Sequence, residues 1–114
     1  MKVTISFQQM EHSDALENHV IEKLEKVSEL LKNEDQRPIH VDVFLKAHKQ
    51  HPHHAVEIHL KAAHFSIDAH DEEPDMYLAV DRAIDRMVSM IKKEKSKLKD
   101  KIHRPETEKA KFYK

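Results

Sequence analysis

Residues 75–101 have the apolar spacing of one long amphipathic helix. Their apolar members recur every three or four positions, at Met76, Val80, Ala83, Ile84, Met87, Val88, Ile91 and Leu98. This spacing places them on a single helical face. At 1.5 Å per residue the helix is roughly 40 Å long. Because one side of it must be buried, the rest of the chain must supply an apolar surface of similar length.

Four other stretches alternate apolar and polar residues, which is the period of a strand with one buried and one solvated face. These predicted strands cover residues 3–7, 39–46, 56–61 and 64–70. A second apolar stripe at helical spacing predicts a helix over residues 14–32 that begins at Ser13-Asp14, with Glu17 in capping-box register. The run Asp71-Glu72-Glu73-Pro74 is predicted to be a turn whose carboxylates lie at the positive end of the last helix.

The resulting element order is β-α-β-β-β-α. We therefore predict an α+β fold, a two-layer sandwich in which two helices cover one face of a four-stranded sheet. Residues 1–101 form the predicted domain. Residues 102–114 contain Pro105 and no apolar period, and they are predicted to be a flexible C-terminal tail.

The composition excludes several classes of active site. The chain has no Cys, so it has no disulfide, thiolate metal site or cysteine nucleophile, and it has no Gly, so it lacks glycine-rich phosphate-binding loops. We predict a protein that is not an enzyme and that has no cofactor and no small-molecule substrate. No apolar run is long enough for a membrane span or signal peptide, so a cytoplasmic location without membrane contact is expected.

Charge is distributed unevenly along the chain. Residues 1–74 carry 8 Lys+Arg and 14 Asp+Glu, a balance of −6, whereas residues 75–114 carry 12 and 7, a balance of +5. On the last predicted helix, Arg82, Arg86, Lys93 and Lys97 share one face. Such a face suits an RNA or DNA backbone, but charge alone fits a solvated helix end equally well, since lysines are favoured near a helix C-terminus.

Histidine is the other unusual feature, with 11 residues. His48, His51, His53 and His54 cluster in one predicted loop, and the strand period places His40, His59, His64 and His70 on the solvated face. A metal-binding module is one alternative. Another is a surface that becomes more cationic as the pH falls from about 7.5 to 6, which predicts tighter polyanion binding at the lower pH.

The strand order and the start of the last helix together resemble the ribosome hibernation promoting factor family. This family includes the ribosome-associated inhibitor A and the sigma-54 modulation proteins. The matching positions are an acidic turn followed by Asp75, Met76, Tyr77, Ala79, Val80, Asp81, Asp85 and Arg86, and then a Lys-rich helix end. The predicted first helix, with Lys23 and Lys26, is also similar to that of the family. The resemblance covers about residues 1–101, and the chain looks like a short form. It departs from the family at Ala62-Ala63-His64, where Gly is common.

This resemblance implies a fold like that of double-stranded-RNA-binding domains. It also implies binding to rRNA in the decoding channel of the small ribosomal subunit, which keeps idle ribosomes inactive during stress or stationary phase. The implied RNA contacts are Lys23, Lys26, Arg82, Arg86, Lys93 and Lys97, with Lys92, Lys95 and Lys99 as weaker candidates. No metal ligand is assigned. A histidine-dependent metal-binding module and a protein-interaction domain stay open as alternatives. The oligomeric state stays open too, as does the choice between silencing single ribosomes and pairing them.

Overall fold

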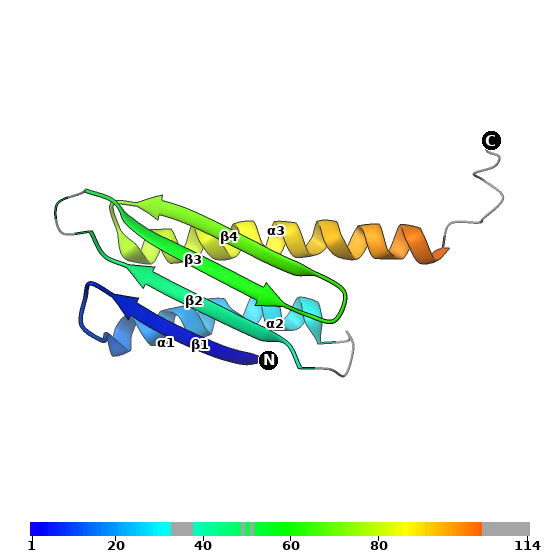
Figure 1. Cartoon of the computed structure of the whole chain (residues 1–114), viewed down its shortest axis with the longest axis horizontal. Helices are drawn as coiled ribbons and strands as arrows, with labels where there is room; N and C mark the ends of the chain where they lie inside the picture. Colours follow the sequence, from blue (N-terminus) through cyan, green and yellow to red (C-terminus); the bar gives the residue numbers. More distant parts are fainter. Residues whose placement is uncertain (33–37, 49, 51, 104–114) are drawn as a thin grey trace.

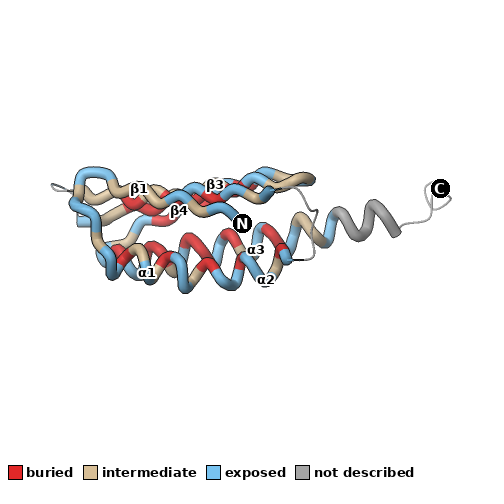
Figure 2. The backbone as a smooth tube through the Cα atoms, turned by 90° about the horizontal axis from the view of Figure 1, so that it is seen from below, coloured by how far each residue is buried: buried red, intermediate tan, exposed pale blue. Residues whose placement is uncertain are grey.

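A computed structural model describes residues 1–32, 38–48, 50 and 52–103, with side chains described as far as residue 97. The elements in chain order are β1 (Lys2–Gln8), α1 (Asp14–Lys23), α2 (Glu25–Leu31), β2 (His40–Lys46), β3 (His54–Lys61), β4 (Ser66–Glu73) and α3 (Met76–His103). Figure 1 shows the four strands side by side, with the helices overlapping them in this view, and Figure 2 shows the strands and the helices as two layers. The predicted α+β sandwich is therefore confirmed. The predicted tail beyond residue 103 lies outside the described residues.

The strands are ordered β1-β2-β3-β4 in the sheet. β1 pairs with β2 in parallel, and the other two pairings are antiparallel. A parallel pair needs a long crossover connection, which here consists of α1 and α2. This leaves β1 and β4 as the two edge strands, and α3 runs along β3 and β4.

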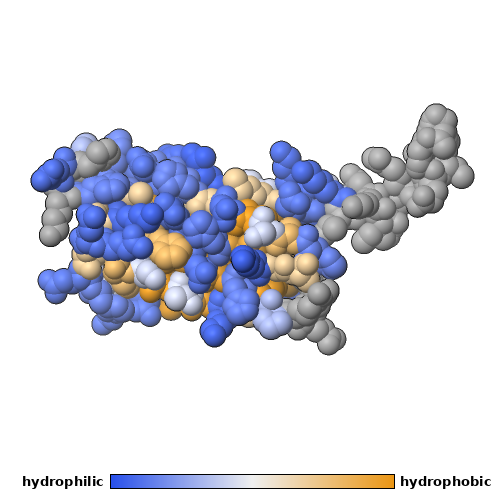
Figure 3. Space-filling view, viewed as in Figure 1, coloured by the Kyte–Doolittle hydropathy of each residue, from blue (hydrophilic) through white to orange (hydrophobic). Residues whose placement is uncertain are grey.

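All the helices cover the same face of the sheet (Figure 2). The apolar residues that alternate along β2, β3 and β4 point toward the helices and are buried, as are the apolar stripes of α1, α2 and α3. Residues of the opposite strand phase make up the open face of the sheet, where His40, His59 and His70 lie as predicted. His64 is exposed as well, but it lies in the β3–β4 connection. Hydrophilic atoms predominate over much of the open face (Figure 3).

The predicted first helix is divided at Leu24, where ψ is −8°. The backbone hydrogen bonds nevertheless continue across this residue: Leu24 N–H donates to the Val20 carbonyl (2.9 Å), and Ser28 N–H donates to the Leu24 carbonyl (3.0 Å). Leu24 and its neighbours in the stripe are buried. The division is therefore a local change of backbone angle, and the apolar face of the predicted helix is kept.

The cap of α1 differs in detail from the prediction. Ser13 is the N-cap, and its Oγ accepts a hydrogen bond from Leu16 N–H at 3.2 Å. Glu17 is one position too far along for the reciprocal bond of a capping box. Its carboxylate lies instead 3.0 Å from His12 Nε2.

Before this helix, Gln9 adopts φ 60°, a left-handed conformation that Gly would adopt more easily.

The prediction of a turn over residues 71–74 was wrong. β4 continues to Glu73, and Asp71 is buried with only 6% of its surface exposed. Asp71 and Glu73 follow Ile67 and Ala69 in strand phase, so they point toward α3. The connection to α3 consists of Pro74 and Asp75, and the Asp75 carboxylate accepts a hydrogen bond from Tyr77 N–H at 3.1 Å.

Candidate nucleic-acid interface

Four of the predicted RNA contacts form one row on α3 beside β4. We call Arg82, Arg86, Lys93 and Lys97 the α3 basic stripe. Their spacings of four, seven and four residues place them within a narrow sector of the helix. All four side chains are exposed. The stripe lies between the apolar face of α3, which contacts the sheet, and the side that faces solvent.

The arginines of the stripe are tied to β4 by two ion pairs. Arg86 Nη2 lies 3.1 Å from Asp71 Oδ1, and Arg82 Nε lies 3.4 Å from Glu73 Oε2. The arginine side chains are 60% and 59% exposed, whereas the two carboxylates are 6% and 22% exposed. The other oxygen of Asp71, Oδ2, is buried and has no hydrogen-bond partner among the described residues. The acids are thus held in the fold, and the arginine heads reach the surface.

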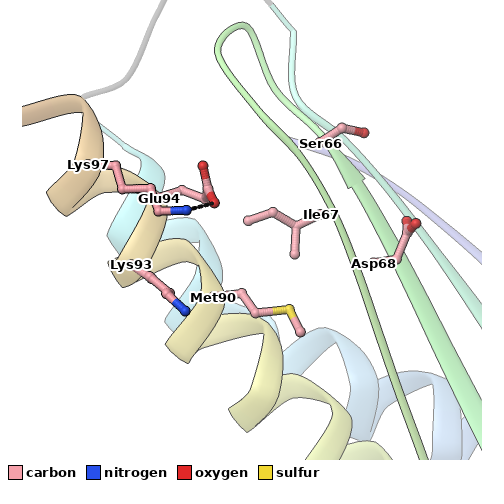
Figure 4. Close-up of a pocket in the computed structure, with 7 residues that line it drawn as sticks. All are labelled: Ser66, Ile67, Asp68, Met90, Lys93, Glu94 and Lys97. Carbon is pink, nitrogen blue, oxygen red and sulfur yellow. Dashed lines mark ion pairs between the residues drawn. The ribbon is translucent and has the colours of Figure 1, made fainter. Parts of the chain in front are cut away.

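The lysines of the stripe border an open pocket of about 290 Å³ between α3 and β4 (Figure 4). Ile67 of β4 points toward the helix and lies across from Met90 and Lys93. Lys97 Nζ lies 3.6 Å from Glu94 Oε2 within the helix. An exposed ion pair of this length contributes little stability, so Lys97 is free to exchange this partner for another anion.

Lys23 and Lys26 lie apart from the α3 basic stripe. Lys26 Nζ approaches α3 at Asp85 Oδ1, 3.7 Å away. Asp85 precedes Arg86 by one residue and so points about 100° around the helix from it. On the same side, His19 Nε2 lies 2.7 Å from Asp81 Oδ1, and its ring packs edge-on against Tyr77. The six predicted contacts therefore form two basic groups rather than one continuous surface.

The weaker candidates are divided by the structure. Lys92 is exposed on α3. Lys95 is half-buried, and its Nζ donates a hydrogen bond to the Leu30 carbonyl at 2.6 Å. This bond satisfies a carbonyl at the end of α2, where helices leave acceptors unpaired. Lys95 thus has a structural role that sequence reasoning missed. The side chain of Lys99 lies outside the described residues.

His59 on the open face belongs to a polar network across β2, β3 and β4. His59 Nδ1 lies 2.6 Å from Asp68 Oδ1, and His59 Nε2 lies 3.5 Å from Glu57 Oε1. Lys46 Nζ lies 2.7 Å from Glu57 Oε2. The hydrogen bond with Asp68 raises the pKa of His59, and the hydrogen bond from Lys46 lowers the pKa of Glu57. The ring of Phe44 packs edge-on against His59.

The predicted histidine loop uses two of its rings for local hydrogen bonds. His48 Nδ1 donates to the His53 carbonyl at 2.6 Å, and His54 Nδ1 accepts from the His48 backbone N–H at 3.2 Å. His51 lies outside the described residues. A different group, His12, Asp14 and Glu17, brings three possible metal ligands within 4.8 Å of one another at the exposed start of α1. Metal binding stays an untested alternative.

The site residues that sequence reasoning missed are two acids of β4, the buried Asp71 and the half-buried Glu73. A signal for them was present, since they continue the alternation of Ile67 and Ala69 in phase. The sequence instead indicated a turn, because Asp and Glu are depleted in strands. In the structure, ion pairs with Arg86 and Arg82 on α3 offset this low strand preference.

Residues 3–99 match the protein family described as Sigma 54 modulation protein / S30EA ribosomal protein. The chain belongs to this family. The resemblance found in the sequence is thereby confirmed, and so is the prediction that the protein is not an enzyme.

Solved structures similar to this S30EA family member share its fold. One is the N-terminal domain of Protein Y from Thermus thermophilus, with a TM-score of 0.69 and 22% identity, covering 82% of this chain and 98% of that chain. Another is a ribosomal subunit interface protein from Coxiella burnetii, with a TM-score of 0.62 and 22% identity, covering 84% of this chain and 99% of that chain. No curated protein sequence matches the chain significantly. Among the described residues, no helix has both the length and the apolar character needed to cross a membrane.

Proposed function

We propose that this protein is a ribosome hibernation factor that binds rRNA of the small ribosomal subunit in the decoding channel. Bound there, it prevents translation by idle ribosomes, as in stationary phase or stress. It acts in the cytoplasm and takes no small-molecule substrate. Membership in the S30EA family supports this function, as do the fold neighbours, one of which is titled a ribosomal subunit interface protein.

The observation that carries the proposal is the α3 basic stripe beside β4. Four cations in a row on a rigid helix match a row of phosphates, and each neutralised phosphate releases counterions. Two of the four are arginines, whose planar guanidinium groups bind phosphate through paired hydrogen bonds. The open face of the sheet fits RNA less well, because Asp42, Glu57, Asp68 and Glu72 are interspersed with its lysines.

Lys23 and Lys26 form a second contact in this proposal. They lie on the α1–α2 side of α3, away from the α3 basic stripe. They therefore contact a different segment of the RNA, either a second strand or a later turn of the strand that binds the stripe. Lys26 must leave Asp85 to bind phosphate, and their 3.7 Å ion pair between exposed side chains is weak enough to allow this.

The test is cosedimentation of the purified protein with small ribosomal subunits at several salt concentrations. Arg82→Glu, Arg86→Glu, Lys93→Glu and Lys97→Glu together are expected to abolish salt-sensitive binding. The control changes Lys2 and Lys61 on the open face to Glu and is expected to retain binding. Lys23→Glu with Lys26→Glu measures the second contact. Binding that survives reversal of the stripe would overturn the assignment, whatever the open-face control does.

A further inference from the structure

Asp71 is an unusual residue to place beside a surface that binds phosphate. It is a buried carboxylate on the edge strand of the sheet, and one of its oxygens has no hydrogen-bond partner among the described residues. Burial of a charge is unfavourable unless the charge is paired. Among the described residues, it is paired with Arg86, 3.1 Å away. A negative charge at this place should also repel RNA, so Asp71 can favour binding only through Arg86.

The geometry of β4 and α3 places two such pairs in register. Asp71 and Glu73 are two strand residues apart, about 6.7 Å. Arg86 and Arg82 are four helix residues apart, about 6 Å along the axis. Because these distances are similar, each carboxylate meets one arginine. The pairs fix both guanidinium groups at the line where the helix meets the edge of the sheet.

Arg86 retains donors for a second anion while it is held by Asp71. A guanidinium group carries five N–H donors in a rigid plane. The ion pair with Asp71 is made by Nη2, and 60% of the Arg86 side chain is exposed. The outward donors are therefore available to a phosphate oxygen. A lysine could not form this bridge in the same way, since its ammonium group is a point charge without a fixed plane.

We propose that Asp71 is a positioning residue for RNA binding, and that its buried carboxylate holds the Arg86 guanidinium in the orientation that meets phosphate. Asp71 then increases the affinity for RNA despite its negative charge, because Arg86 loses less side-chain freedom on binding. Glu73 acts on Arg82 in the same way but less strongly, since Glu73 is more exposed and its contact is longer. This inference rests on the proposed function of the α3 basic stripe.

The test compares two neighbouring acids on β4. Asp71→Asn and Glu72→Gln remove the same charge with little change in shape. Glu72 points to the open face, where it lies 3.6 Å from His70. Affinities are measured for small ribosomal subunits and for a duplex RNA of arbitrary sequence. Asp71→Asn is expected to weaken binding about two- to tenfold, the cost of ordering one long side chain. Glu72→Gln is expected to leave affinity unchanged or to raise it.

A double-mutant cycle with Arg86→Gln separates positioning from general destabilisation. In the Arg86→Gln background, Asp71→Asn is expected to have no weakening effect, because no guanidinium group is left to orient. Arg86→Lys, which keeps the charge, is expected to lose affinity. If Asp71→Asn unfolds the chain, NMR relaxation of the Arg86 Nε–H group in the unaltered protein tests the same point. An ordered guanidinium group supports the proposal, and a freely rotating one contradicts it.

The binding results distinguish failure of the proposed ribosomal function from failure of the positioning role of Asp71. If the unaltered protein binds duplex RNA but not small subunits, the ribosomal function fails while the positioning role can still be measured. If it binds neither, both fail. If it binds and Asp71→Asn tightens binding as Glu72→Gln does, Asp71 acts as a simple repulsive charge and the positioning role is wrong.

Discussion

His59 Nδ1 lies 2.6 Å from Asp68 Oδ1, across the antiparallel pair of β3 and β4. Its pKa is raised, mainly by this hydrogen bond. The charged imidazole therefore stabilises the fold. This contribution is complete below the ordinary value of 6.5 and is lost as the pH rises through the folded-state pKa. Because the side chain is 40% exposed, solvent screening limits it to about 1 kcal/mol or less.

Asp68→Asn is accordingly expected to lower the His59 titration midpoint, measured from its imidazole NMR signals. The variant should also lose stability at pH 5.5 but much less at pH 8.5, as measured by urea unfolding. Asp42→Asn is a useful control, since Asp42 is opposite His59 in the sheet register but forms no ion pair with it among the described residues. An unchanged His59 midpoint in Asp68→Asn would contradict the assigned cause.

Ser13 caps α1, and Ser13→Ala should lower the free energy of unfolding by about 1 kcal/mol. The reason is that Leu16 N–H loses its acceptor at the helix start. Ser89→Ala on the exposed surface of α3 should have no effect or be slightly stabilising, because Ala is the better helix former. Chemical denaturation measures both. Equal losses from the two substitutions would argue against a capping role for Ser13.

Ile91 on α3 is fully buried, whereas Ile21 on α1 is 49% exposed. Ile91→Ala should lower the free energy of unfolding by about 2–5 kcal/mol, because it leaves a cavity in the core. Ile21→Ala should cost less than about 1 kcal/mol, since water already reaches that side chain. Thermal or urea unfolding compares the same chemical change at the two positions, and similar losses would refute the packing of α3 on the sheet.

Lys93 and Lys95 are two residues apart but should affect different properties. Lys95→Met should lower the free energy of unfolding by about 0.5–1.5 kcal/mol, because it removes the hydrogen bond to the Leu30 carbonyl. Lys93→Met should leave stability nearly unchanged and lower the salt dependence of RNA binding by about one phosphate contact. Unfolding curves and RNA affinity at several salt concentrations measure the two properties. If Lys93→Met lowered stability and Lys95→Met lowered the salt dependence of RNA binding, the two assignments would be wrong.

Much of the fold follows from sequence periodicity, because each strand has one buried face and each helix one apolar stripe. The positions of β2 and α3 in the sequence, and their buried faces, were predictable for this reason. The end of β4 was not, because Asp71 and Glu73 have the local preferences of turn residues and are held in a strand by Arg86 and Arg82 on α3. The division of the first helix at Leu24 could not be predicted either, because the apolar spacing continues through this residue without a break.

The candidate site was only partly predictable. Helical spacing was enough to group the α3 basic stripe. It could not show that Lys26 reaches α3 on a different side, because this depends on how α2 packs against α3. Nor could it show that Lys95 bonds to Leu30, which is 65 residues away in sequence.

The inward carboxylates of β4 have one more consequence, for self-association. An edge strand exposes unpaired backbone groups that can recruit a strand from another molecule, and inward-pointing charges are one way in which proteins prevent this. A strand added beside β4 would crowd the Asp71–Arg86 and Glu73–Arg82 pairs and take water away from the arginine heads. The residues that attach α3 to the sheet thus also discourage aggregation through this edge.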